Sequence, residues 1–234
     1  MRSFVALAIG MLALSGVASA QSPAAPAAPS QAPTATAAAP APKAEHGYAE
    51  VVLQSAFGNV TSQSFGGEVG VTVFPNVQIF GEFGQVRDVA TAGIGTAAQL
   101  IAGFLSQTQS GVAFSVKEPV TFGVVGVKYN VPIAGSKVRP YVMGGGGMAS
   151  VKQNVAFTVG GSDITSALAS TYGVQLGTDL SGTFTSPMIV IGGGAAYPVW
   201  QQMIVDLQFR FGRIMADGGG INVSRAGIGV GLRF

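Results

Sequence analysis

Apolar side chains recur at every second residue over long stretches of this chain, and this period limits the possible folds more than any other feature. In residues 203–212, five of them share one face: Met203, Val205, Leu207, Phe209 and Phe211. The residues between them are mostly polar or glycine. Successive side chains of a β-strand point to opposite faces of a sheet, so a two-residue period predicts strands rather than helices.

The pattern predicts an all-β fold of eight strands. They are expected at 47–57, 64–74, 77–87, 120–131, 138–152, 187–197, 202–214 and 221–234. Each is about as long as a tilted strand that crosses a bilayer, roughly 9–11 residues. Short links alternate with longer ones, and the longest cover 88–119 and 153–186. This layout is typical of an antiparallel up-and-down transmembrane β-barrel with longer loops outside the cell.

The low content of charged residues points the same way. Charged side chains make up 9% of the chain and hydrophobic ones 48%, whereas an ordinary soluble domain carries about 25% charged residues. This composition disfavours a cytosolic enzyme. A net charge of +2 without a basic run predicts no nucleic-acid partner. The absence of cysteine excludes disulfides and thiolate metal sites, and we expect no metal and no cofactor.

Strand alternation assigns each charge to a face. The set expected inside the barrel balances four acids against four bases: Glu50, Glu68, Glu82, Lys128, Asp206, Arg210, Arg225 and Arg233. The remaining charges fall in links, strand ends or the N-terminal region. None falls on the lipid-facing middle of a strand, where Arg or Lys would cost about 2–4 kcal/mol. Arg213 faces outward near the loop-side rim, where its guanidinium is expected to contact lipopolysaccharide phosphate or to be a plain rim charge.

The N-terminal region is typical of an exported protein. Residues 1–20 have a basic start at Arg2, an apolar run and the small-residue pattern Ala18-Ser19-Ala20, which predicts a signal peptide cleaved after Ala20. Residues 21–45 are rich in alanine and proline and are expected to form an extended, disordered linker in the periplasm. Residues 46–234 are then the barrel domain, with its C-terminus also periplasmic.

Four short segments carry a resemblance to a known family: Gly47-Tyr48, residues 77–82, residues 139–142 and residues 227–234. On these segments the chain resembles the outer-membrane β-barrel domain family, which includes opacity-type proteins and the membrane domain of the OmpA type. The resemblance implies a structural, adhesive or binding role rather than catalysis. It also implies that the barrel assembly machinery reads the last strand, through Gly229, Gly231, Leu232 and Phe234.

The function expected from these features is a non-catalytic outer-membrane protein whose two long loops form a candidate surface for an extracellular ligand. Residues 95–107 and 162–176 are expected to be short helices, either as a binding surface or packed on each other over the barrel mouth. A narrow channel is the alternative. An enzyme is less favoured, because the only histidine, His46, lies at the linker junction. A soluble barrel that carries a ligand would require the opposite arrangement, with the apolar side chains inside the barrel and the charged ones outside.

Overall fold

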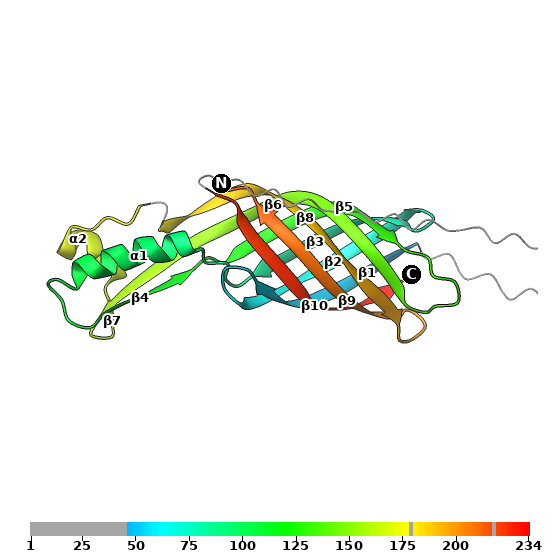
Figure 1. The fold of residues 1–234 in the computed structure, drawn as a ribbon, viewed down its shortest axis with the longest axis horizontal. Helices are drawn as coiled ribbons and strands as arrows, with labels where there is room; N and C mark the ends of the chain where they lie inside the picture. The colour runs from blue at the N-terminus through cyan, green and yellow to red at the C-terminus, as the bar shows by residue number, and fades with distance from the viewer. Residues whose placement is uncertain (1–45, 178–179, 217–218) are drawn as a thin grey trace, which may run out of the picture. The chain divides into compact units, whose positions relative to one another are not determined.

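Eight antiparallel strands close into a barrel in the computed structural model, which describes residues 46–177, 180–216 and 219–234 (Figure 1). The barrel strands are β1 (Gly47–Phe57), β2 (Ser62–Phe74), β3 (Val77–Val86), β5 (Val120–Asn130), β6 (Arg139–Val159), β8 (Ser181–Pro198), β9 (Met203–Ile214) and β10 (Ile221–Arg233). The predicted eight-stranded barrel is therefore confirmed. The predicted signal peptide and the whole of the predicted linker lie outside the described residues.

Closure of the barrel joins the first and last strands. β1 pairs with β10 from Tyr48 opposite Arg233 to Phe57 opposite Ser224. The backbone N–H of Phe234 adds a bond of 3.0 Å to the carbonyl of Gly47. Each remaining barrel strand pairs with two neighbours, and the β6–β8 pairing completes the ring. No edge of the eight-stranded ring is left unpaired, which is what a bilayer without hydrogen-bonding groups demands.

The two ends of the barrel differ in their links. At one end, here called the turn end, lie three short links (residues 75–76, 131–138 and 199–202) together with the start of β1 and the end of β10. Pro75 and Asn76 make the tightest of them, and Asn76 takes a positive φ of 65°, a conformation that asparagine tolerates well. The longer links lie at the other end, here called the loop end.

The face assignments follow the predicted alternation. Val51, Leu53 and Leu207 point outward, and Leu207 exposes 66% of its surface. The residues that alternate with them point inward and are buried. An apolar outer face and a polar, charged interior are the arrangement of a transmembrane barrel. The soluble-carrier alternative is therefore wrong, because it requires the opposite faces.

The two long links contain more regular structure than the sequence suggested. β6 continues to Val159 instead of ending near residue 152, and β8 begins at Ser181 instead of 187. Between them lie β7 (Ser162–Asp163), the 3-10 turn η1 (Thr165–Ala167) and α2 (Leu168–Tyr172). The other link holds α1 (Ala92–Leu105) and β4 (Val112–Lys117), and β4 pairs with the end of β6. Each link therefore contains a helix that overlaps the range expected for one, together with short strands and strand extensions that were not expected.

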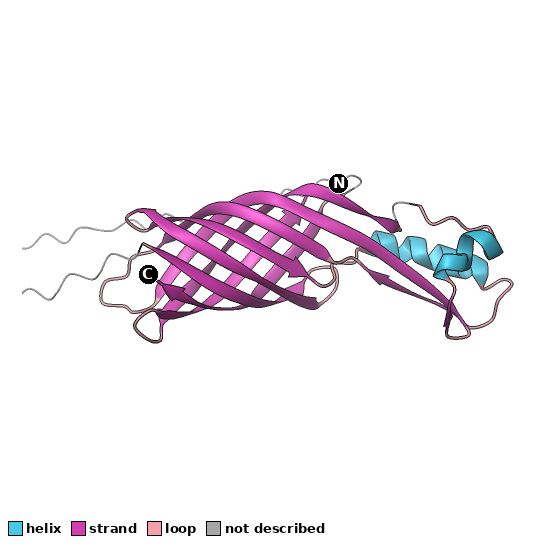
Figure 2. Ribbon diagram, turned by 180° about the vertical axis from the view of Figure 1, so that it is seen from behind, coloured by secondary structure: helices cyan, strands magenta, loops and turns pink. Residues whose placement is uncertain are grey.

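The elements of these links form one folded structure, here called the loop module: α1, β4, β7, η1, α2 and residues 154–159 of β6 (Figure 2). It has its own apolar cluster, made of Ile94, Ala98, Ala102, Leu105, Val155, Phe157, Leu168 and Leu180. The helices thus pack against the end of β6. Side chains of both helices share this cluster, and a separate apolar cluster lies inside the barrel toward its loop end. The second helix is also shorter than predicted, because Gly173 ends α2 with a φ of 66°.

Among the described residues, none of the helices is long and apolar enough to cross a membrane.

Candidate functional site: the barrel interior and the loop module

Seven of the eight charged residues predicted for the interior are buried together in the barrel. They are Glu50, Glu68, Glu82, Lys128, Asp206, Arg210 and Arg225, here called the central ion network. The eighth, Arg233, is half-buried at the turn end, and its backbone N–H bonds to the carbonyl of Gln202 at 2.7 Å.

The register brings three acids of the central ion network into one row. Glu50 on β1 lies directly opposite Glu68 on β2, and Glu68 lies directly opposite Glu82 on β3. Like charges that face each other across strands are destabilising. Three adjacent carboxylates inside a barrel therefore require cations from the opposite wall.

Arg210 supplies the main compensating charge. Its guanidinium lies 2.6 Å from Glu68 Oε2, 2.6 Å from Glu82 Oε2 and 3.9 Å from Glu50 Oε1. The side chain is fully buried, with 0% relative exposure. Arginine suits this position because its planar fork reaches two carboxylates at once and stays charged when buried. One side chain from β9 thus links strands β1, β2 and β3 across the interior.

Two further cations complete the balance. Lys128 Nζ lies 2.5 Å from Glu68 Oε1, and Arg225 Nη1 lies 2.7 Å from Glu82 Oε1. Arg225 also donates to Gln54 Oε1 at 3.3 Å, and its guanidinium stacks 4.3 Å above the Phe122 ring. Ion pairs of this kind are strong only when further hydrogen bonds satisfy the buried groups. For Arg225, the side chain of Gln54 supplies one such hydrogen bond.

Two tyrosines extend the central ion network and were missed by the sequence reasoning. The hydroxyl of Tyr48 donates to Glu68, and that of Tyr141 donates to Asp206 Oδ2 at 2.6 Å. Lys128 Nζ lies 4.4 Å from both ring centroids, between the two aromatic faces. A signal for both was available, because each tyrosine has the inward parity of its strand.

Glycines make room for these large side chains. A Cβ atom on Gly70 would overlap the ring of Tyr48, and one on Gly194 would lie 2.6 Å from the hydroxyl of Tyr141. Gly229 leaves space for the side chains of Gln208 and Glu50 in the same way. The glycine-rich strands therefore serve the packing of the interior as well as its curvature.

An apolar cluster fills the interior toward the loop end. It includes Ala56, Val86, Val120, Val151, Ile214, Ile221 and Val223 from the barrel strands. Val89, from the link after β3, packs into the same cluster and is buried. Together with the central ion network, this cluster fills the interior with side chains, as the size of an eight-stranded barrel leads one to expect.

A cluster of hydrogen bonds, made by the carboxylates of Asp88 and Glu118, fixes the link around Val89 to the barrel rim. Asp88 Oδ1 accepts the backbone N–H groups of Ala90 and Glu118, each at 2.9 Å. Glu118 is 1% exposed, and its Oε2 accepts the N–H of Thr91 at 2.7 Å. Two carboxylates thus satisfy backbone donors next to the start of α1, where negative charge is favourable. These hydrogen bonds fix the start of α1 and the end of β4 to each other at the base of the loop module.

The remaining predicted residues lie on the outer surface or near the chain end. Arg213 is exposed on β9, and its Nη1 donates to Asn222 Oδ1 at 3.2 Å. Leu232 and Phe234 are exposed, whereas a Cβ on Gly231 would overlap the backbone of β1. His46 is exposed, and its carbonyl accepts the N–H of Thr72 at 2.9 Å. The structure thus gives His46 a backbone role at the start of the barrel.

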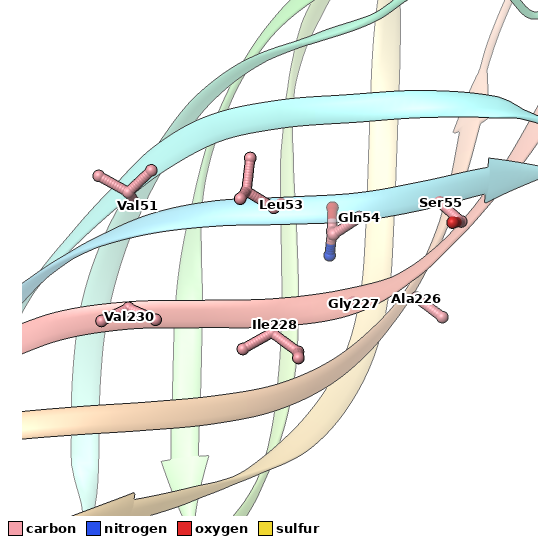
Figure 3. Close-up of a pocket in the computed structure, with 8 residues that line it drawn as sticks. All are labelled: Val51, Leu53, Gln54, Ser55, Ala226, Gly227, Ile228 and Val230. Carbon is pink, nitrogen blue, oxygen red and sulfur yellow. The ribbon is translucent and has the colours of Figure 1, made fainter. Parts of the chain in front are cut away.

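A shallow apolar groove follows the β1–β10 seam on the outer face (Figure 3). Its borders are Val51 and Leu53 on one strand and Ile228 and Val230 on the other. The small residues Ser55, Ala226 and Gly227 also line it. This surface suits a hydrocarbon chain and carries no acid or base.

Comparison with known proteins finds no matching family model and no matching curated protein. Several solved structures are similar in fold. Neisserial surface protein A is 14% identical, with 80% of this chain and 94% of that chain covered and a TM-score of 0.47. Ail, the attachment invasion locus protein of Yersinia pestis, is 11% identical, with 81% and 99% covered and a TM-score of 0.46.

A major outer-membrane protein from Thermus thermophilus is 11% identical, with 80% of this chain and 99% of that chain covered and a TM-score of 0.48. These likenesses concern the fold alone. The strand pairings and the distribution of apolar and charged faces make the described chain a transmembrane β-barrel of eight strands, built like the small barrels of bacterial outer membranes.

Proposed function

We propose that this chain is a non-catalytic outer-membrane barrel that displays the loop module at the cell surface as a contact surface. In this orientation the turn end, the N-terminal linker and the end of β10 lie in the periplasm, and the loop end lies outside. The observation that carries the proposal is the length of β6. Its 21 residues exceed the roughly 9–11 that a tilted membrane strand needs, and the excess forms part of the loop module.

The loop module has the properties of a contact surface. α1 carries no charged residue, and its buried side chains Ile94, Ala98 and Leu105 leave the opposite face free. On that free face Leu100 is 72% exposed and Phe104 is 57% exposed. Residues four apart on a helix are neighbours, so these two side chains form one apolar patch. Exposed apolar patches on folded elements are typical of interaction sites.

The test is retention of cells that display the protein on polystyrene beads, an uncharged apolar probe. We expect the L100S/F104S variant to reduce retention severalfold, because it removes the apolar patch without touching the buried side of α1. The matched control is T96S/Q99S on the same helix face, which should retain the wild-type value. Equal retention of L100S/F104S and wild type, at equal surface amounts, would contradict the proposal.

Assembly of the barrel is proposed to depend on the last strand. Gly231 allows the close approach of β10 to the β1 backbone, and Gly229 leaves room for the interior side chains of Gln208 and Glu50. Leu232 and Phe234 are exposed at the end of the strand. These residues are available for recognition by the barrel assembly machinery before the barrel closes.

Arg213 is proposed to contact lipopolysaccharide phosphate at the loop-side rim, because its guanidinium is exposed on the outer face.

A further inference from the structure

Acidic and basic side chains are sorted between the inside and the outside of the described chain. Every described Asp and Glu is buried or half-buried except Asp163. By contrast, six described cations are exposed: Arg87, Lys117, Lys137, Arg139, Lys152 and Arg213. Among the described residues, exposed cations therefore far outnumber exposed acids. Such a surface selects anionic partners.

Two of these cations share one face where the barrel passes into the loop module. Lys117 on β4 lies opposite Asn154 on β6, and Lys152 stands two residues before Asn154 on the same face of β6. On the other side of β6, Asn154 lies opposite Ser181 and Lys152 lies opposite Thr183, both on β8. Side chains paired in this way across strands lie within roughly 4.5–8 Å. We call these five residues the basic face.

Each residue of the basic face is exposed. Neither lysine forms an ion pair with any carboxylate that the structure describes. The acid next in sequence to Lys117 is Glu118, whose side chain points to the opposite face of the chain. It is buried on the inner side, where its carboxylate accepts the N–H of Thr91. The fold thus places two ammonium groups, an amide and two hydroxyls on one surface and turns the carboxylate of Glu118 away from it.

The position of the basic face identifies the occupant. Exposed apolar side chains lie on the same outward faces, toward the turn end. They are Met148 on β6 and Ile189 and Ile191 on β8. The basic face therefore lies where the lipid-facing surface ends, at the level of the headgroups. Ammonium groups bind phosphate, and the amide and hydroxyls hydrogen-bond sugar hydroxyls.

We propose that the basic face binds the phosphate-bearing sugar headgroup of an anionic glycolipid in the surrounding outer leaflet. This inference rests on the proposed outer-membrane orientation. It names a specific lipid site, on strands that are remote in sequence from Arg213. A lipid bound there would link β4, β6 and β8 at the root of the loop module and stabilise the module on the barrel.

The test uses the full purified chain in neutral detergent, with lipopolysaccharide as the probe. We expect the apparent affinity to fall roughly tenfold or more in the K117Q/K152Q variant, because each basic residue near an anionic surface contributes severalfold. The matched control is K137Q/R139Q, which removes the same charge at the turn end and should bind as wild type does. Equal affinities of K117Q/K152Q and wild type would overturn the proposal.

Two further arms identify the source of the phosphate. Dephosphorylated lipopolysaccharide is expected to bind wild type and K117Q/K152Q equally weakly. Inorganic phosphate at the same phosphate concentration is expected not to compete. Full competition by inorganic phosphate, or undiminished binding of the dephosphorylated lipid to wild type, would overturn the assignment to a glycolipid headgroup.

Orientation is tested separately, so that the two proposals fail in different ways. The chain has no cysteine, and S115C adds one at an exposed position of β4. A membrane-impermeant maleimide should label S115C in intact cells. Labelling only after lysis would contradict the orientation, and the glycolipid site would fall with it. Labelling in intact cells combined with unchanged lipopolysaccharide affinity of K117Q/K152Q would overturn the glycolipid site alone.

Discussion

Arg210 is the residue on which the charge balance of the interior depends. It is fully buried and contacts Glu68 and Glu82 at 2.6 Å. Without it, Glu68 would keep its ion pair with Lys128, and Glu82 would keep its ion pair with Arg225. Removal of one partner from a buried ion pair leaves an uncompensated charge, which costs about 3–5 kcal/mol.

We therefore predict that R210M lowers the free energy of unfolding by about 3–5 kcal/mol. Methionine keeps much of the apolar volume of arginine but brings no charge. The measurement is equilibrium unfolding of the barrel in guanidinium chloride, followed by the loss of the compact band in unheated gels. The matched control is R213M, because Arg213 is exposed on the same strand. A loss in R210M no larger than that in R213M would show that the central ion network does not depend on Arg210.

Strand parity was sufficient to predict which charged residues share the interior, but not which of them meet. The sequence assigned Glu50, Glu68 and Arg210 to inward faces. The row of adjacent acids depends on the register between strands, which is fixed by turns and by the irregularity between Thr72 and Phe74. The tyrosine partners were missed because an inward Tyr48 or Tyr141 looks like an ordinary core residue.

At the scale of elements, β6 belongs both to the barrel wall and to the loop module. Its first part pairs with β5 and β8 inside the barrel wall, and its last six residues pair with β4 in the loop module. The sequence contained a sign of this extension, because Val155, Phe157 and Val159 continue the two-residue period. The extension was missed because Lys152, Gln153 and Asn154 interrupt the apolar pattern where the strand leaves the membrane.

The packing of α1 makes a prediction about the loop module alone. Ala98 is buried in the module's apolar cluster, whereas Gln99 is exposed on the same helix. A buried, unpaired carboxylate costs several kcal/mol. We therefore expect A98E to open the loop module and speed its cleavage by chymotrypsin roughly tenfold or more, with Q99E as the matched control. The compact band of the barrel should remain.

Cleavage of A98E at the rate of Q99E would contradict the packing of α1 on β6. Loss of the compact band in A98E would contradict a different point, the independence of the barrel from the loop module. The two clusters share no residue, so we expect the barrel to tolerate an opened module.

At the scale of the whole described chain, buried side chains occupy the barrel interior. The central ion network occupies one part, and the apolar cluster around Val89 occupies the part toward the loop end. We therefore predict no stable, porin-sized conductance in planar bilayers, because an eight-stranded barrel is filled by its own side chains. R210M and wild type should both lack such steps. Reproducible large steps from the wild-type protein would contradict a filled interior.

The sequence was sufficient to predict the eight strands, their order and their faces. Lipid on one side of each strand and a filled interior on the other impose a strict alternation of apolar and polar side chains. The loop module was less predictable. Its two helices were expected, but their packing on β6 depends on a cluster that gathers segments far apart in sequence, such as those that carry Ala98 and Leu168. The basic face also escaped prediction, because Lys117 and Lys152 become neighbours only through the β4–β6 register.

The pairing of β1 with β10 has a consequence for the order of folding. Tyr48 and Arg233 are neighbours across this seam, although nearly the whole described chain separates them. Hydrogen bonds of β1 toward that side can form only after β10 is present, so this seam cannot form before the last strand of the described chain is available. Closure over a long chain costs little additional free energy, about 0.6 kcal/mol per doubling of length, but distant pairings form slowly. The growing barrel therefore has an open β1 edge until the last strand arrives, and such an unpaired edge is a site where another chain can pair.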